Sequence, residues 1–235
     1  MKQNIFFVLL STLGLFACSP AEIALSPDLN AQAMSVKGRN GLQIGQVIRY
    51  GEYRTDKVRR GWTGSYDVPF RLRFRGAKEK MSFTQFGPEN EVAEVACISK
   101  FNSIELPIVQ DFFGIPLDYQ NFFAGNISIG TMEWDFVIHN PNGDFLREKA
   151  SAGFVQNGPN RIEIQAVRAL KGQPNWMKEL AVYGHEFMLN GKVVGAVSTV
   201  NRGKVWIDNT LEAHTRTVIA ALATGLLLRT DVEGV

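Results

Sequence analysis

The sequence predicts a mainly β fold: a single antiparallel β-barrel-like domain of about 11–12 strands around a hydrophobic C-terminal α-helix. From residue 42 onward, short apolar segments alternate with Gly, Asn, Asp and Pro, which is typical of all-β domains. Residues 218–228 carry no charge and are apolar on every helical face, whereas a surface helix shows a polar stripe. This segment is also too short to span a bilayer, which needs about 20 residues. We therefore expect the sheet to surround this helix.

Composition and charge narrow the functional classes. The chain has 235 residues, of which 45% are hydrophobic and 20% charged, as in an ordinary globular protein. The formal net charge is only +2, so nothing in the total favours nucleic acid, and we expect no nucleic-acid partner. The two cysteines are Cys18 and Cys97, which leaves no disulfide framework if Cys18 is used for another purpose.

The first 17 residues have the pattern of a signal peptide: a basic start, an apolar run at residues 5–16 and a small residue before the cleavage point. Leu15-Phe16-Ala17-Cys18 resembles the lipobox of bacterial lipoproteins. That resemblance implies diacylation of the Cys18 thiol, cleavage before Cys18 and acylation of its new amine, and hence stable anchoring in a membrane. Ser19, where an aspartate would imply retention in the inner membrane, implies the outer membrane, with the folded domain facing the periplasm.

Residues 18–41 show no sustained periodicity and contain Pro20 and Pro27. We expect them to form a lipid-anchored tether that lets the folded domain stand off the membrane. Residues 42–235 then form the β-rich domain.

The expected strands follow in order along this domain. In residues 67–75, Phe70, Leu72 and Phe74 alternate with arginines, the period-two pattern of a strand with one apolar face. Asn190-Gly191 predicts a hairpin with a type I′ turn, because these residues tolerate the positive φ that the turn requires. The other segments with strand patterns are residues 44–50, 80–86, 92–101, 134–139, 144–155, 161–168, 182–189, 192–200 and 204–208.

The C-terminal helix is expected at about residues 210–228. Asn209 is a suitable N-cap, and Glu212 three residues later gives a capping-box arrangement. Arg229 places a cation at the end of the helix where the dipole is negative.

The order of these elements resembles the tubby-like fold, shared by tubby C-terminal domains, LURP-one-related proteins and phospholipid scramblases. The resemblance covers about residues 42–228 and is best over residues 183–228, where hairpin, strand, Trp206-Ile207-Asp208 and helix follow in order. It implies a twelve-stranded barrel that encloses the hydrophobic helix, and no catalytic or ligand motif of those families matches residue by residue. The alternative is a lipocalin-like barrel with an external helix, whose helix should show the polar stripe that residues 218–228 lack.

No local motif indicates catalysis, a metal or a cofactor. His139, His185 and His214 each stand alone without the spacing of a zinc site, and we expect them at the surface or at strand ends. Cys97 lies in an apolar, strand-like run without a nearby base, as a buried structural cysteine does. A nucleophile elbow, a phosphate loop and a dinucleotide fingerprint are also missing. We therefore expect no catalytic residue, no metal and no cofactor.

Two stretches are candidates for contact with a ligand. Residues 49–80 contain ten basic residues against four acids, and Arg71, Arg73 and Arg75 would form a row on one strand face. Such a row could contact anionic lipid or an acidic partner, or be a solvated face that discourages edge pairing. Residues 107–124 form an aromatic stretch that could be an apolar contact loop or a cap over an open barrel end. Its aromatic residues are Phe112, Phe113, Tyr119, Phe122 and Phe123.

These observations favour a cell-envelope lipoprotein that acts as a non-catalytic binding or scaffolding module, attached to the membrane through lipidated Cys18 and contacting anionic lipid or an envelope protein. The alternative is an envelope hydrolase or transferase whose site is assembled from distant residues. A cavity lined by convergent polar groups would favour the enzyme, and a barrel filled by its helix would favour the module.

Overall fold

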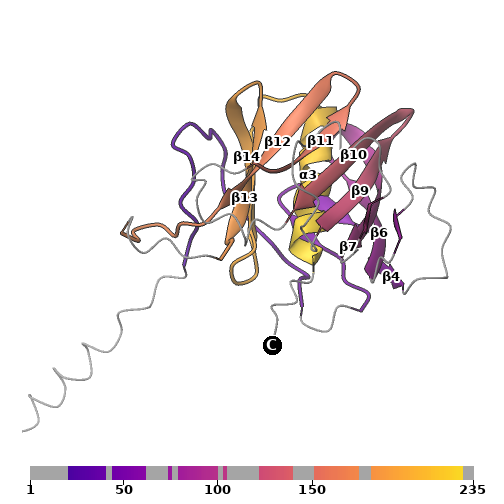
Figure 1. Cartoon of the computed structure of the whole chain (residues 1–235), viewed down its shortest axis with the longest axis horizontal. Helices are drawn as coiled ribbons and strands as arrows, with labels where there is room; N and C mark the ends of the chain where they lie inside the picture. Colours follow the sequence, from indigo (N-terminus) through magenta and orange to yellow (C-terminus); the bar gives the residue numbers. More distant parts are fainter. Residues whose placement is uncertain are drawn as a thin grey trace, which may run out of the picture.

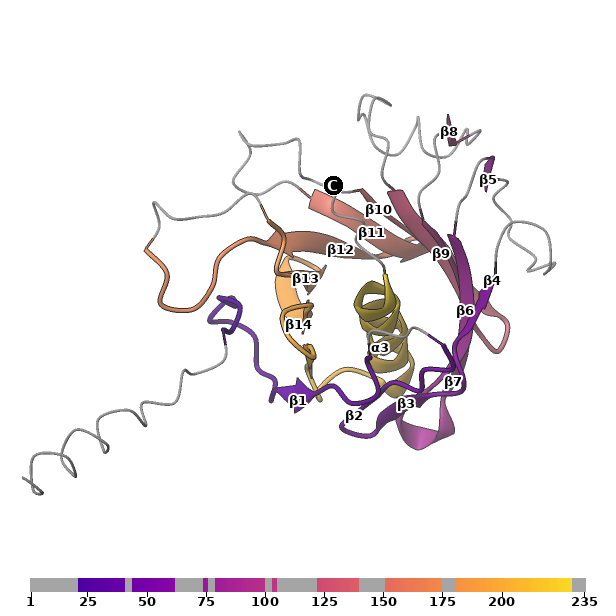
Figure 2. The ribbon, with the colours of Figure 1, turned by 90° about the horizontal axis from the view of Figure 1, so that it is seen from below.

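The described part of the chain is an antiparallel β-barrel with one helix inside it (Figure 1). The computed structural model describes residues 21–40, 44–61, 74–75, 79–99, 103–104, 122–139, 151–174 and 181–229. Figure 2 looks nearly along the helix α3 (Ala213–Leu228) and shows the strands as a ring around it. The predicted fold class is confirmed, and the alternative with an external helix is wrong.

Twelve strands follow one another around the barrel, and each pair of neighbours is antiparallel. Together with three short strands off this path, the described strands are β1 (Met34–Ser35), β2 (Arg49–Tyr50), β3 (Tyr53–Thr55), β4 (Arg59–Gly61), β5 (Phe74–Arg75), β6 (Glu79–Phe86), β7 (Val92–Ser99), β8 (Ser103–Ile104), β9 (Phe122–Ile129), β10 (Met132–His139), β11 (Ser151–Asn157), β12 (Asn160–Val167), β13 (Gly184–Leu189), β14 (Lys192–Ser198) and β15 (Lys204–Ile207). Their order around the barrel is β1-β15-β14-β13-β12-β11-β10-β9-β7-β6-β3-β2. β4 pairs with β6 beside this path, and β5 pairs with β8 in a separate two-stranded sheet.

The two edges of the sheet meet beyond β1 and β2. Lys37 N donates to Arg49 O at 2.8 Å, and Arg49 N donates to Lys37 O at 3.0 Å. This bridge leaves the barrel nearly closed, which protects the edge strands from pairing with another chain.

The core lies between the inward side chains of the strands and α3. Phe83 of β6, Val95 of β7 and Phe136 of β10 belong to the same cluster as the helix residues. Every residue of α3 from Thr217 to Leu228 is buried. A helix that is apolar all round is stable in water only when it is surrounded, and the barrel provides this environment.

A buried polar network fixes the helix against the wall. The Tyr50 hydroxyl lies 2.8 Å from Ala220 O and 2.9 Å from Thr224 Oγ1. Thr224 Oγ1 in turn donates to Gln85 Oε1 at 2.7 Å. Gln85 and Thr224 are both 0% exposed. Because buried polar groups are costly when unpaired, this network favours one rotation of the helix in the barrel.

The sequence correctly predicts the hairpin between β13 and β14 and the end of the helix. Asn190 and Gly191 have φ of 52° and 77°, as a type I′ turn requires, and they join β13 to β14. The helix ends at Leu228, where the Arg229 N–H donates to Gly225 O at 2.9 Å.

The predicted start of the helix is wrong by about one turn. The helix begins at Ala213, with Glu212 at the N-cap position and no side-chain cap. Asp208 Oδ1 instead accepts hydrogen bonds from Thr210 N at 2.9 Å and Thr210 Oγ1 at 2.7 Å. This turn at residues 208–211 leads the chain from β15 into the barrel before the helix begins.

Some predicted strands differ from the observed ones. The first, at residues 44–50, is reduced to β2, and Ile44 is 85% exposed. The sequence does not predict β9, whose first three residues belong to the aromatic stretch 107–124. Residues 67–73 of the arginine strand lie outside the described residues.

The N-terminal strap, defined as residues 21–40, begins on the outside of the barrel and joins its wall as β1. Ile23 is 3% exposed and packs with Val167 and Trp206 in a second apolar cluster. Further on, Ser35 pairs with Lys204 of β15. The sequence predicts a tether over residues 18–41, whereas this described part of it belongs to the folded domain. Its partners are remote in sequence, so no local periodicity reveals the docking.

The two ends of the barrel differ in their connections. At the hairpin end, tight turns join β9 to β10, β11 to β12 and β13 to β14, and α3 begins. The loop end holds the last residues of four strands, β4, β7, β10 and β12, and the longer connections to the next strands begin there. The helix α3 also ends at the loop end. The arginine stretch, and all but the last three residues of the aromatic stretch, belong to connections that begin at the loop end.

Candidate functional site

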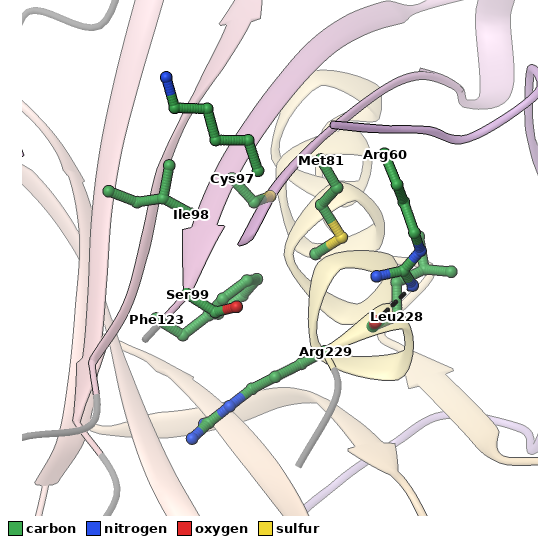
Figure 3. A pocket seen from close by; sticks show the side chains of 9 residues that line it. Arg60, Met81, Cys97, Ile98, Ser99, Phe123, Leu228 and Arg229 are labelled. Atoms are coloured by element: carbon green, nitrogen blue, oxygen red, sulfur yellow. Dashed lines mark hydrogen bonds between the residues drawn. The ribbon is translucent and has the colours of Figure 1, made fainter. Parts of the chain in front are cut away.

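Three basic residues from different elements lie near the end of α3 at the loop end. Arg60 comes from β4, Lys80 from β6, and Arg229 directly follows the helix. Figure 3 shows Arg60 and Arg229 at a small cavity together with Cys97 and Phe123, among others. Lys80 also belongs to the lining of this cavity. All three are half-buried. We call Arg60, Lys80 and Arg229 the basic cluster.

The strand geometry explains why Arg60 points into the barrel. Successive side chains of a strand face opposite sides. Arg59 is on the outer side, with its side chain 58% exposed and 3.7 Å from Asp56 Oδ2. Arg60 turns inward and donates from Nη2 to Leu228 O at 2.7 Å (Figure 3).

The helix dipole contributes to the electrostatics of this end. The last carbonyls of α3 carry partial negative charge, which is stabilised by nearby cations. Arg60 satisfies one of these carbonyls, and the Arg229 guanidinium lies 6.0 Å from the centre of the Phe123 ring. Arg60 and Arg229 of the basic cluster therefore have a structural role at the helix end, in addition to any contact with a ligand.

The cavity is too small for an organic ligand. Its volume is about 10 Å³, which is room for about one water molecule. A phosphate-bearing group would therefore meet the basic cluster at the rim of the barrel and not inside it.

Cys97 lies on the inner face of β7 beside this cavity. It is 0% exposed, and burial raises the pKa of its thiol, an effect that the positive charge of Arg60 only partly opposes. A protonated, buried thiol is a poor nucleophile. The prediction of a buried structural cysteine is confirmed.

The structure connects the arginine stretch to the aromatic stretch through their backbones. Arg75 belongs to β5 and pairs with Ser103 of β8, and the connection that contains β8 continues into the aromatic stretch. Both connections start from the loop end. The side chain of Arg75 is not among those described, and Arg71, Arg73, Phe112, Phe113 and Tyr119 lie outside the described residues.

Phe123 does not belong to an exposed contact loop. It is 0% exposed on the inner face of β9, and its ring centre lies 5.3 Å from that of Phe136. The expectation for this residue is wrong because the alternation of β9 turns it toward the helix. Phe122 is the first residue of the same strand, and its side chain is not described.

A set of ion-paired side chains lies at the hairpin end, and the sequence does not predict it. Arg216 of α3 pairs with Glu89 at 2.9 Å and with Glu52 at 3.4 Å. These ion pairs tie the start of the helix to the wall. Beside them, Tyr53 is almost fully buried, and burial raises the pKa of its hydroxyl to about 12.

Two of the three histidines, His185 and His214, have side chains that the structure describes. Trp134 Nε1 donates to His214 Nε2 at 3.0 Å, and His214 Nδ1 lies 3.9 Å from Glu91 Oε2. His185 is only 5% exposed and is the second residue of β13, so it agrees with the strand-end alternative of the prediction and not with the surface one. Within the described ranges, no three His, Cys, Asp or Glu residues are placed to hold a metal ion.

Comparisons with family models, with curated proteins and with solved structures find no match for this chain. Among the described residues, no helix has the length and apolar character needed to cross a membrane.

Proposed function

We propose that this chain is a cell-envelope lipoprotein, acylated at Cys18 in the outer membrane and facing the periplasm, whose barrel is a non-catalytic module that binds anionic lipid headgroups. The observation that carries the proposal is the basic cluster at the loop end. Arg60, Lys80 and Arg229 all belong to the lining of one small cavity, and the connection that contains the predicted arginine row leaves from the same end.

The filled barrel supports a binding module over a carrier or an enzyme with a deep pocket. Ala220, Ala221 and Leu222 of α3 are each 0% exposed, so the helix occupies the space that a lipid carrier would need for its ligand. Ligand pockets for small molecules usually measure about 300–1,000 Å³. The cavity beside the basic cluster is far smaller. Nothing among the described residues favours the hydrolase or transferase.

Two resemblances also support the proposal. The lipobox-like Leu15-Phe16-Ala17-Cys18 supplies the membrane attachment. A barrel around a hydrophobic C-terminal helix is what the resemblance to the tubby-like fold and the phospholipid scramblases implies, and those families include proteins that act at membranes.

Acylation is tested by metabolic labelling with palmitate in cells that express the wild type or Cys18→Ala. We expect label on the wild type and none on the variant, because the Cys18 thiol is the diacylation site. Equal labelling of the two proteins would contradict the lipoprotein assignment.

Lipid binding is tested by flotation of the chain from residue 18 onward, carrying Cys18→Ser, with vesicles of phosphatidylethanolamine and phosphatidylglycerol. This chain retains all residues of the described fold but lacks the acyl chains. A Lys80→Gln/Arg229→Gln variant should bind about 30-fold more weakly, from about 1 kcal/mol for each basic residue at an anionic surface.

The matched control is Arg54→Gln/Arg161→Gln, which removes the same charge at the hairpin end. These arginines lie 4.4 and 4.2 Å from the rings of Phe86 and Phe154, so the control loses two close aromatic contacts, whereas the test variant loses the one of Arg229 at 6.0 Å. We expect it to bind like the wild type. Equal binding by both charge variants would refute the role of the basic cluster, and binding of an envelope protein without binding of vesicles would replace lipid by protein as the partner.

A further inference from the structure

The start of the N-terminal strap is fixed at a defined place on the barrel. Glu22 pairs with Lys204, which lowers the pKa of the Glu22 carboxyl. Glu22 O also accepts from Lys171 N at 2.7 Å, and Ala24 N donates to Ala169 O at 2.9 Å. Glu22 is therefore held on the barrel surface by side-chain and backbone contacts.

This attachment lies at the loop end. Lys204 begins β15 and follows Gly203. A methyl group placed on Gly203 would come within 2.5 Å of Leu227 Cδ2, so this turn touches the last turn of α3. The first residues of the strap and the basic cluster are thus on the same end of the barrel, on different parts of its rim.

The distance to the lipidation residue is short. Only three residues separate Cys18 from Glu22, and four steps of extended chain reach at most about 14 Å. The helix α3, with 16 residues, is about 24 Å long and gives the distance between the two ends of the barrel. The segment from Cys18 to Glu22 is thus shorter than the barrel, and it joins the strap at the loop end.

We infer that the acylated protein stands on its own membrane with the loop end toward the bilayer, so that the basic cluster faces anionic headgroups of the same leaflet that holds the acyl chains. This inference rests on the proposed function and adds to it which membrane the cluster contacts and in which orientation. Attachment raises the effective concentration of headgroups at the cluster, so even weak electrostatic contacts are occupied. The N-terminal strap thereby aligns the binding surface.

The docked strap is essential to this geometry. If residues 21–40 hung free, the attachment would be about 80 Å of extended chain, and the barrel could present any face to the membrane. Instead Ile23 is buried, and Ser26 N donates to Glu186 Oε1 at 2.6 Å on the barrel wall. Orientation is therefore built into the packing of the strap.

The test compares the depth of two labelled positions in the acylated full chain, reconstituted in vesicles of phosphatidylethanolamine and phosphatidylglycerol that contain a headgroup-spin-labelled lipid. Pro174→Cys places a fluorophore at the loop end, and Thr131→Cys places one at the hairpin end; both residues are exposed. Labelling is selective because Cys18 is acylated and Cys97 is buried. We expect loss of fluorescence at position 174 and none at position 131.

Several outcomes bear on the inference. Smaller quenching at position 174 in vesicles of phosphatidylcholine alone, and in the Lys80→Gln/Arg229→Gln background, would support a contact between the cluster and anionic headgroups. The Arg54→Gln/Arg161→Gln background should leave the quenching unchanged. Equal quenching at the two positions, stronger quenching at position 131, or quenching that is independent of anionic lipid would overturn the inference.

The two proposals fail in different experiments. If the unacylated chain loses vesicle binding through Lys80→Gln/Arg229→Gln but the acylated chain shows no preference between the labelled ends, the proposed function stands and the orientation is wrong. If position 174 is quenched only in anionic vesicles although the unacylated chain shows no binding by flotation, the orientation stands and independent lipid binding is wrong.

Discussion

The contact between the helix and the barrel wall is most directly tested at Tyr50 and Thr224. Thr224 donates its single hydroxyl proton to Gln85 Oε1. The Tyr50 hydroxyl must then be the donor toward Thr224 Oγ1, and it shares this proton with Ala220 O. Burial raises the pKa of the Tyr50 hydroxyl, which keeps it protonated as a donor.

The expected losses in the free energy of unfolding depend on which buried polar groups each substitution leaves without a hydrogen-bond partner. Tyr50→Phe removes one donor and leaves Ala220 O with its helical partner, so we expect a loss of about 1 kcal/mol in the free energy of unfolding. Thr224→Val leaves Gln85 Oε1 without its donor in a fully buried site, so its cost should be larger, about 2–3 kcal/mol. The double variant should lose about 1 kcal/mol less than the sum, because the two single variants break one shared hydrogen bond.

The assay is urea unfolding followed by tryptophan fluorescence and circular dichroism, with the slope of the transition checked for each variant. Thr224→Ser is the control, because it keeps the hydroxyl and loses only a methyl group, worth about 0.8 kcal/mol. The reasoning is refuted if Thr224→Val is as stable as the wild type. It is also refuted if the two single effects add within about 0.3 kcal/mol.

Three further predictions concern the core, acid stability and the thiol. Gly225→Ala should have nearly the wild-type stability in thermal unfolding, because a gain of about 1 kcal/mol in helix propensity offsets the 3.3 Å approach of the new methyl group to Phe123. Gly225→Leu should cost about 1–3 kcal/mol by overpacking. Equal stability of the two variants would contradict a filled barrel. Hydrogen bonds from Thr210 are the main cause that lowers the pKa of Asp208, so its stabilisation is present above about pH 4 and is lost as the pH falls through the folded-state value. Asp208→Asn should therefore show a flatter stability profile below about pH 4, and a profile parallel to that of the wild type would be evidence against this. Cys97 should react with a thiol reagent at pH 8 only as fast as the domain opens, and rapid labelling of the folded protein would show that the thiol is accessible.

Several features could be predicted because they depend on short-range patterns. The alternation in residues 80–86 marks β6, Asn190-Gly191 supplies the positive φ of a hairpin turn, and Arg229 ends the helix. The start of the helix could not be predicted from capping residues alone. Asn209 and Glu212 fit a capping box, but the bonds from Thr210 to Asp208 keep this part of the chain in a turn.

The candidate site was predicted only in part. The basic excess in residues 49–80 includes Arg60 and Lys80 of the basic cluster. The sequence pattern, however, distinguishes only the row at Arg71, Arg73 and Arg75. Arg60 was counted in that excess without being distinguished, because nothing local shows that it reaches Leu228 O, 168 positions along the chain. For the same reason Phe123 was read as part of a loop, although β9 continues through it and turns it inward.

The sequence by itself determined the class of fold, since the spacing of apolar residues records which faces of each strand are buried, and residues 218–228 have no face suited to water. Only the tertiary structure decided where the N-terminal strap lies and which side chains surround the helix end. Ser26 meets Glu186 across 160 positions, and Tyr50 meets Thr224 across 174. Such contacts depend on the strand order and on the closure of the barrel, which place distant segments together, and local periodicity carries no information about that placement.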